Sequence, residues 1–232
     1  MTIAMTSKEA APAPRHDLYY GIHKGIRYAH CRLLTKLGSF DLDSDAALGD
    51  VIAAVRNHFL LCRGHLEHED HEIHAALESR RPGASRVAEE GHEDHANSFV
   101  ELETLLERLA ETPRSGRAAA AHALYRRFAL FMADDFVHMN EEETILQPAL
   151  HEAFDDRELM DIEHRIVTSI PAEEMPLNLA PMFASMHPDE RRGMLGDMKT
   201  GMPAEAFAGM MEGLVKPNIP ANEWDALVDL RA

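Results

Sequence analysis

Proline is scarce over most of this 232-residue chain, and its few positions set the helix boundaries. Between residues 16 and 147 only Pro82 and Pro113 occur, each within a polar break, RRPGAS and ETPRSG. Because proline interrupts helices, the stretches between these breaks can each form a long helix. No stretch of useful length alternates apolar and polar residues as a half-buried strand does. The sequence therefore predicts an all-α fold.

Apolar residues recur at three- and four-residue spacings in four segments, as they do along the buried stripe of an amphipathic helix. We expect helices over residues 17–37, 44–78, 85–112 and 115–147. Ser44 is the expected N-cap of the second helix, and Pro148 is expected to kink or stop the fourth. The short loops predict an up-down-up-down antiparallel four-helix bundle over residues 16–155.

The residues on either side of this bundle differ from it in composition. Residues 1–15 are expected to form a disordered tail, and residues 156–232 a C-terminal extension of short helices. A fifth helix is expected over residues 155–169, and further helices at Pro188, Pro203 and Pro220, since proline is tolerated in a first turn. Methionines are concentrated in this extension. They could dock a protein partner or a second copy, pack the short helices together or, as the least favoured role, bind copper.

Ten residues of the second helix, His65 to His74, read HLEHEDHEIH and combine four histidines with four carboxylates. At ~100° per residue, His65, Glu69 and Glu72 share the face that continues the apolar line of the helix. A histidine and a carboxylate are therefore expected to point inward. The angles of His68, His71 and His74 move progressively away from that face, and we do not expect these three to bind metal.

The loops relate this helix to its neighbours, because residues equally far from a tight turn lie at the same height on antiparallel helices. His23 and His65 are symmetric about residue 44, in the first loop. The midpoint between His65 and His92 is 78.5, and that between His65 and His95 is 80; both are near the second loop. The midpoint between His92 and His138 is 115, and that between His95 and His138 is 116.5; both are in the third loop. One histidine from each helix therefore falls in a single layer.

Carboxylates complete this layer. His138 and Glu142 repeat the spacing of His65 and Glu69, so two helices each offer a histidine and a glutamate one turn apart. In such a bundle, imidazoles bind metal terminally and inward carboxylates bridge two cations. The predicted metal ligands are His23, His65, Glu69, His92, His95, His138 and Glu142. This set suits iron, manganese or zinc, and the lack of cysteine in the layer argues against a structural zinc site.

With these residues the chain resembles a known family. The stretches HKGIR, HLEHED, GHEDH and HMNEEETILQPAL make residues 16–155 similar to the hemerythrin-like proteins of the HHE cation-binding group. The resemblance implies a non-haem di-iron centre with terminal histidines, with Glu69 and Glu142 as bridges, and with an open position for oxygen or a related small molecule. His92 and His95 are three apart, whereas the oxygen carriers have two histidines four apart and many bacterial relatives have one. His95 lies nearer the centre of the apolar stripe and is the preferred single candidate.

A second group of histidines lies along the same helices. His30 and His58 are also symmetric about residue 44, and should meet about 10 Å from the metal layer at ~1.5 Å rise per residue. Cys31 and Cys62 are next to this pair in sequence. We interpret the pair as supporting the metal ligands or handling protons, or more simply as a hydrogen-bonded buried pair. Asp135 either orients a ligand or is a partly exposed acid.

Composition argues against several classes of partner. A net charge of −17 with no basic stripe disfavours nucleic acid and anionic membranes. No apolar run approaches the ~18 residues of a membrane helix. The first residues contain no apolar stretch long enough for a signal peptide, and the two cysteines form no disulfide framework, so we expect a cytoplasmic protein.

Three functional hypotheses follow. The leading one is a hemerythrin-like di-iron protein that binds or reacts with a small oxidant, namely dioxygen, peroxide or nitric oxide. The second is an enzyme, either catalase-like or delivering iron to damaged clusters. The third is a sensor whose C-terminal helices report the metal state to a partner. A carrier would bind oxygen reversibly, an enzyme would turn over, and a sensor would change its C-terminal segment with metal; the sequence does not separate them.

Overall fold

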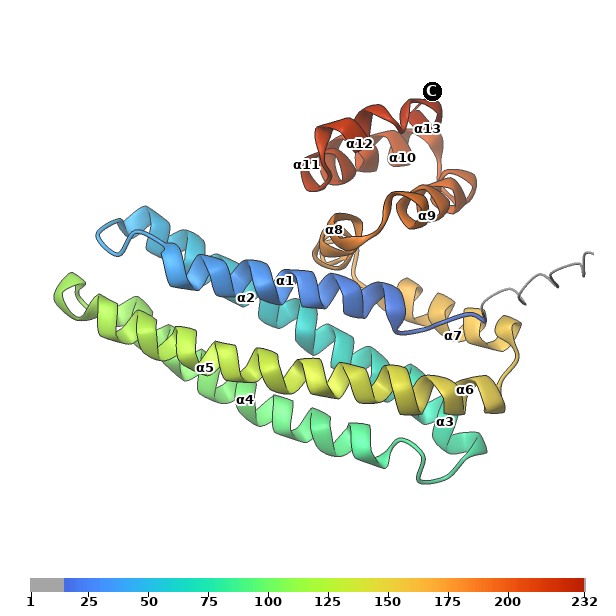
Figure 1. The fold of residues 1–232 in the computed structure, drawn as a ribbon, viewed down its shortest axis with the longest axis horizontal. Coiled ribbons are helices and arrows are strands. Elements are labelled where there is room, and N and C mark those ends of the chain that lie inside the picture. Colours follow the sequence, from blue (N-terminus) through green and yellow to red (C-terminus); the bar gives the residue numbers. More distant parts are fainter. Residues whose placement is uncertain (1–14, 232) are drawn as a thin grey trace, which may run out of the picture.

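A computed structural model describes residues 15–231, and every regular element in that range is helical (Figure 1). The predicted all-α class is confirmed. Apart from Arg15, the tail predicted for residues 1–15 lies outside the described residues. The four longest helices are α1 (Tyr20–Ser39), α2 (Asp45–His68), α4 (Arg86–Glu111) and α5 (Arg114–Glu141).

The ends of these helices follow from local sequence. The Ser44 side chain accepts a hydrogen bond from the backbone N–H of Ala47 at 3.2 Å, which confirms the predicted N-cap. Before α4, the Glu78 carboxylate accepts hydrogen bonds from the backbone N–H groups of Gly83 (2.6 Å) and Ser85 (2.9 Å). Gly83 has a φ of 85°, which glycine adopts without strain. The break RRPGAS is thus a closed turn between two helices.

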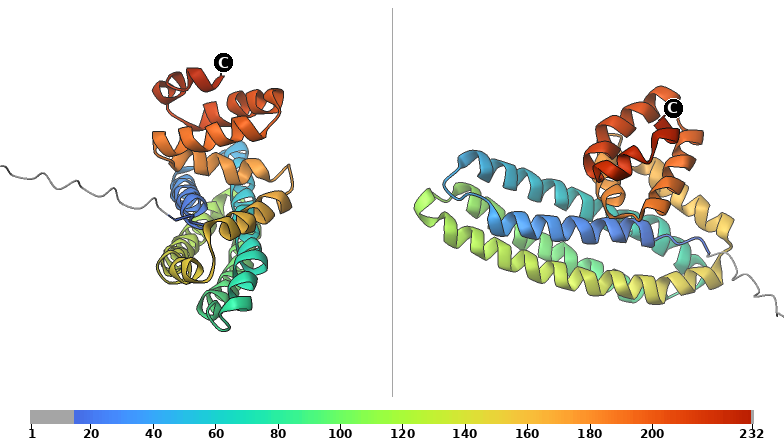
Figure 2. Two further views of the ribbon diagram at one scale, coloured as in Figure 1. Left: turned by 90° about the vertical axis from the view of Figure 1, so that its right-hand side faces the viewer. Right: turned by 45° about the horizontal axis from the view of Figure 1, so that its top comes forward.

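The four long helices lie side by side (Figures 1 and 2). Both α1 and α4 contact α2 and α5. Ile26, Val55, Phe99 and Phe128, one from each helix, belong to a single buried cluster. The inward faces of all four helices therefore surround one interior, and the candidate ligands project into it.

Two of these helices widen into π-helical turns where the acidic motifs lie. The segments are η1 (Glu69–His74), followed by α3 (Ala75–Arg80), and η2 (Glu142–Leu146), followed by α6 (Gln147–Ala153). A π turn closes its hydrogen bond over five residues rather than four, which changes the faces of the residues beyond it. The helix expected to kink or stop at Pro148 does not stop there, because α6 continues to Ala153. Pro148 occupies the first turn of α6, where a missing N–H is tolerated.

The C-terminal part of the chain consists of short helices, as expected. They are α7 (Asp156–Ser169), α8 (Met175–Ser185), α9 (Pro188–Gly201), α10 (Ala204–Met210), η3 (Met211–Val215), α11 (Lys216–Asn218), α12 (Ala221–Asp225) and α13 (Val228–Arg231). Helices begin at Pro188 and directly after Pro203 and Pro220, which confirms the proline interpretation. Helix α8 was not expected from the sequence, because Pro176 and Pro181 lie inside it.

The helices α8 to α13 bury a core of their own, with Phe183, Leu195 and Trp224 among its members. Most of the methionines of this region pack against that core, so they join the short helices to one another. By contrast, α7 packs with the long helices, in a second cluster that includes Tyr19 and Ile73.

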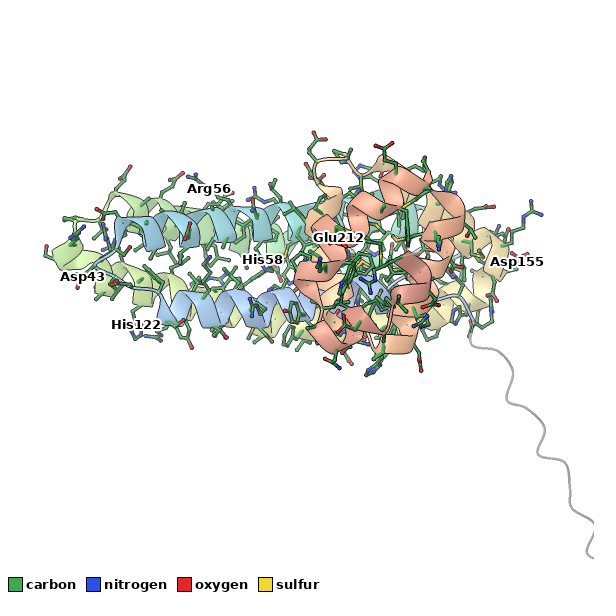
Figure 3. The ribbon with its side chains drawn as sticks, turned by 90° about the horizontal axis from the view of Figure 1, so that it is seen from above. Asp43, Arg56, His58, His122, Asp155 and Glu212 are labelled. Carbon is green, nitrogen blue, oxygen red and sulfur yellow. The ribbon has the colours of Figure 1, made fainter. Side chains whose placement is uncertain are left out.

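The extension rests on the first long helix (Figures 2 and 3), where α8 lies against α1. Two glycines of α1 permit this approach: a Cβ added at Gly25 would lie 3.0 Å from the backbone nitrogen of Met182, and one at Gly21 would lie 3.3 Å from its Cε. The extension therefore covers the helix that carries His23. Among residues 15–231, no helix has the length and apolar character needed to cross a membrane.

Candidate metal centre

Four of the predicted ligands form a first buried group: His23, His65, Glu69 and Glu142. Their ligand atoms all lie within 4.8 Å of one another. His23 Nε2 is 3.4 Å from Glu69 Oε1 and 3.4 Å from Glu142 Oε2, and His65 Nε2 is 3.1 Å from Glu69 Oε1. These atoms come from α1 and from the two helices in which a histidine precedes a glutamate by four residues.

A second buried group combines Glu69, His92, His138 and Glu142. His92 Nε2 lies 3.5 Å from Glu69 Oε2 and 3.5 Å from Glu142 Oε1, and His138 Nε2 lies 3.2 Å from Glu142 Oε1. Both glutamates thus belong to both groups, and each turns one oxygen toward each group. This is the arrangement that two cations with bridging carboxylates require.

Most of the converging atoms have no hydrogen-bond partner. The unpaired atoms are Nε2 of His65, His74, His92 and His138, Oε2 of Glu69, and both carboxylate oxygens of Glu142. Buried polar atoms are almost always hydrogen-bonded, so a cluster of unpaired ones facing one another calls for an occupant. Imidazole nitrogens and carboxylate oxygens are ligands for transition metals. The buried His/Glu groups could therefore hold metal ions.

His74 corrects the sequence analysis. It was expected to face away from the metal layer, but it is 1% exposed, its ring stacks on that of His92, and its Nε2 lies 4.0 Å from Glu142 Oε1. The cause is η1: in an unbroken α-helix His74 would lie about 140° from Glu69, whereas a five-residue π turn brings the two onto one face. By contrast, His71 is exposed, as expected.

His95 was the preferred ligand on its helix, but the structure brings His92, not His95, to the shared glutamates. His92 takes part in the second group, whereas His95 Nδ1 lies 3.5 Å from Asp135 Oδ1 and belongs to neither of the two groups. The two histidines are buried and three residues apart, which places them about 4.5 Å apart along the helix. Nearness to the centre of the apolar stripe therefore did not show which of the two histidines lies level with the shared glutamates.

Two carboxylates orient the histidines from behind. Asp70 accepts hydrogen bonds from Nδ1 of His92 (2.7 Å) and of His74 (3.1 Å), leaving both Nε2 atoms to face the cluster. Glu143 does the same for Nδ1 of His23 at 3.0 Å. Such outer carboxylates fix ring orientation and raise ligand basicity. Neither carboxylate was predicted from the sequence, although each directly follows a shared glutamate in the motifs HLEHED and HMNEEE.

The same contacts set the protonation of the metal-free protein. Burial disfavours the charged form of His23, but its hydrogen bonds with Glu143 and Glu69 outweigh this and raise its pKa to about 9. Burial likewise opposes charging of His92, and the Glu142 and Glu69 carboxylates raise its pKa to about 11. For His65 burial prevails and lowers the pKa to about 4. Without metal, the carboxylates are thus partly neutralised by protonated histidines.

The predicted pairing of His30 with His58 is confirmed. His30 Nδ1 lies 2.9 Å from His58 Nε2, and Cys62 Sγ lies 3.4 Å from the same nitrogen. On the other side, His30 Nε2 donates to Asp135 Oδ2 at 2.6 Å. Asp135 is therefore buried and links this pair to His95, rather than touching the shared glutamates.

A pocket of about 600 Å³ lies between the candidate metal centre and the extension. Its floor includes His65 and Glu69 of the first group, and its other wall is largely methionine, from Met175 and Met182 to Met198. The remaining predicted ligands do not line it. An exogenous molecule in this pocket would meet His65 of the first group and the shared Glu69, whereas the histidines of the second group do not line it.

Comparisons with known proteins leave the family open. No protein-family model matches the chain, and no solved structure matches it. The chain is similar to the F-box/LRR-repeat protein 5 of Xenopus tropicalis, with 27% identity over 158 residues. These residues make up 68% of this chain and 23% of that protein, so the chain spans about a quarter of the length of this relative.

Proposed function

We propose that the chain is a hemerythrin-like, non-haem di-iron protein that binds or reacts with a small oxidant such as dioxygen, peroxide or nitric oxide. The observation that carries the proposal is the pair of buried groups that share Glu69 and Glu142. We further infer that the four long helices form the up-down-up-down antiparallel bundle that the sequence predicts. Its interior is the usual place for dinuclear carboxylate sites in all-α proteins.

Iron is the proposed metal because the donor set is imidazole and carboxylate without thiolate. Manganese and zinc accept the same ligands, so metal identity rests on the resemblance to the hemerythrin-like family. The bound pair would supply redox chemistry, while the chain supplies orientation and exclusion of water. Two bridging carboxylates also offset the charge of two divalent ions in a buried site.

The two groups differ in the number of side chains that converge on them, and this difference supports an open position at the first group. Four side chains converge at the first group, and His74 adds a fifth to the second. The first group also borders the methionine-lined pocket through His65 and Glu69. We place the exogenous ligand there. The apolar wall of this pocket favours small neutral molecules over hydrated ions.

One observation favours the sensor as a second candidate. Because α8 lies on α1 at Gly21 and Gly25, and its Met182 lines the pocket above His65, the extension is in contact with the metal-binding helices. Metal loading could therefore alter its packing and, through it, a protein partner or a second copy. The catalase-like and iron-repair enzymes remain alternatives within the same chemistry, and a cytoplasmic location remains a prediction.

The test is metal analysis of untagged protein with optical spectra before and after addition of oxygen or peroxide. We expect two irons per chain and an oxidant-dependent spectrum. Because Glu69 is shared, Glu69→Gln should lower the occupancy of both ions, whereas Glu67→Gln, an exposed neighbour, should change neither. Absence of iron, or equal content in both variants, would refute the dinuclear assignment. A spectral change that reverses on deoxygenation would indicate a carrier, and catalytic turnover of the oxidant would indicate an enzyme. Metal-dependent protection of the extension from protease would indicate a sensor.

A further inference from the structure

Outside the dinuclear centre, the described residues contain another buried convergence of metal-binding atoms. We propose that His30, His58 and Cys62 bind a third, separate transition-metal ion that prefers imidazole and thiolate, either copper or zinc. None of these residues contributes to the dinuclear centre, so the proposal does not depend on the proposed function.

The geometry is close to that of a bound ion. His30 Nδ1 lies 2.9 Å from His58 Nε2, Cys62 Sγ lies 3.4 Å from His58 Nε2, and the three atoms lie within 4.8 Å of one another. Around a tetrahedral zinc with bonds of 2.0–2.3 Å, such atoms would be about 3.3–3.6 Å apart. The distances of 2.9 Å and 3.4 Å to His58 Nε2 each differ from these values by less than about half an ångström.

The residues around this site orient His30 and shield it from water. Asp135 Oδ2 accepts a hydrogen bond from His30 Nε2 at 2.6 Å, which leaves Nδ1 free to bind an ion. This is the carboxylate–histidine arrangement found behind most metal-binding histidines. The His30 ring is surrounded by Phe128, Phe131 and Phe136, with ring centroids 5.5–5.8 Å away. An apolar aromatic shell of this kind excludes water from a metal–thiolate bond.

The site is also accessible. His58 lines a pocket of about 650 Å³ that is bounded by Tyr28 and Arg32 of α1 and by Leu177 of α8. In Figure 3 the labelled His58 lies between α1 and α2, beside the edge of the extension. An ion could thus enter without passing through the dinuclear centre. Two histidines with one cysteine form a ligand set used for copper, and zinc accepts the same donors.

The hydrogen-bonded series Asp135–His30–His58–Cys62 would produce similar distances without any ion, so the experiment must detect a sulfur–metal bond. Metal-free full-length protein would be titrated with Co²⁺, whose thiolate complexes have a charge-transfer band that imidazole and carboxylate complexes lack. We expect this band in the wild type, saturating at one ion per chain, and its displacement by Zn²⁺ or Cu⁺. Whichever ion displaces it at the lower concentration is the preferred occupant.

The two cysteines provide a matched control. Cys62→Ser should abolish the band and reduce the Co²⁺ stoichiometry by one, whereas Cys31→Ser, a change at an exposed neighbour of His30, should leave both unchanged. Glu142→Gln should impair the dinuclear centre and retain the band. A wild type without the band, or a Cys62→Ser variant that keeps it, would overturn the proposal. Should Cys62→Ser fail to fold, X-ray absorption of zinc-loaded wild type decides: sulfur at about 2.3 Å supports the site, and its absence refutes it.

Discussion

His74 and Glu142 lie on different helices, and the Nε2 atom of the first is 4.0 Å from the Oε1 atom of the second. Both side chains are buried, and neither atom has a hydrogen-bond partner. Each residue belongs to a π-helical turn, so two local widenings of the helices meet at this contact. Such turns are frequent at functional sites. In the proposed dinuclear centre, the second ion would therefore have one more side-chain ligand than the first.

Replacing His74 tests this asymmetry. His74→Ala should weaken metal binding at the second group by roughly 10- to 100-fold while the first group retains its ion. His71→Ala is the control, because His71 is on the same π turn but exposed. Calorimetric titration would show one of two binding events weakened in the first variant only. Identical titrations for the two variants would return His74 to the structural role that the sequence predicted.

Metal binding should release protons, because the metal-free protein keeps His23 and His92 charged. Their pKa values of about 9 and 11 lie above the usual 6.5, and a metal must displace these protons. At pH 7.5 we expect the release of roughly two protons per chain, measured by calorimetry in buffers of different ionisation enthalpy. The apparent affinity should therefore rise with pH. A binding enthalpy that is independent of the buffer would contradict the assigned ligands.

The same raised pKa of His23 gives the metal-free protein a defined stability profile. A folded-state pKa above the unfolded one contributes stability that is complete below pH 6.5 and is lost as pH rises through about 9. Thermal unfolding of metal-free protein should therefore occur at lower temperature at pH 9 than at pH 7. In His23→Gln this dependence should be weaker, and an unchanged profile would count against the assignment.

Gly91 should be essential for the position of His138. A Cβ at Gly91 would lie 2.6 Å from His138 Nδ1. In Gly91→Ala, the overpacking cost of about 1–3 kcal/mol should exceed the helix gain of about 0.5–1 kcal/mol, and metal content should fall. Gly49→Ala is the control, because a Cβ at Gly49 meets nothing within 4 Å and should stabilise the fold slightly. Denaturant unfolding and metal analysis of both variants would check this.

The sequence predicted the helices and the layer of ligands well where periodicity and loop symmetry apply. Residues 23, 65, 92 and 138 do converge, because a short loop fixes the relative height of the two helices that it joins. The pairing of His30 with His58 follows from the same symmetry about residue 44. These relations depend only on distance along the chain, so they can be read without coordinates.

The remaining features depend on departures from regular helix. Nothing in the ten residues HLEHEDHEIH signals that Glu69–His74 winds as a π turn, so His74 was placed on the wrong face. The approach of Asp70 to His92 crosses between helices and depends on their packing. Helix α8 was missed because the rule that proline breaks helices outweighed the packing of Leu179 and Phe183 in the core of the extension.

Tyr19 supplies the last prediction, since its hydroxyl has no hydrogen-bond partner although the residue is 0% exposed. Burial, reinforced by the negative charges of Glu142 and Glu69, raises the pKa of Tyr19, so the phenol keeps its proton and can donate it. Its ring centroid lies 5.1 Å from that of His23, so we expect the hydroxyl to donate to a ligand bound at the proposed dinuclear centre. Tyr19→Phe should leave folding and metal content unchanged, because it removes an unpaired polar group. In iron-loaded protein it should weaken binding of azide or nitric oxide by roughly 5- to 30-fold, the equivalent of one hydrogen bond of about 1–2 kcal/mol. Tyr125→Phe, near Gly38 at the other end of α1, is the control. Equal affinities in the two variants would assign Tyr19 to the apolar core alone.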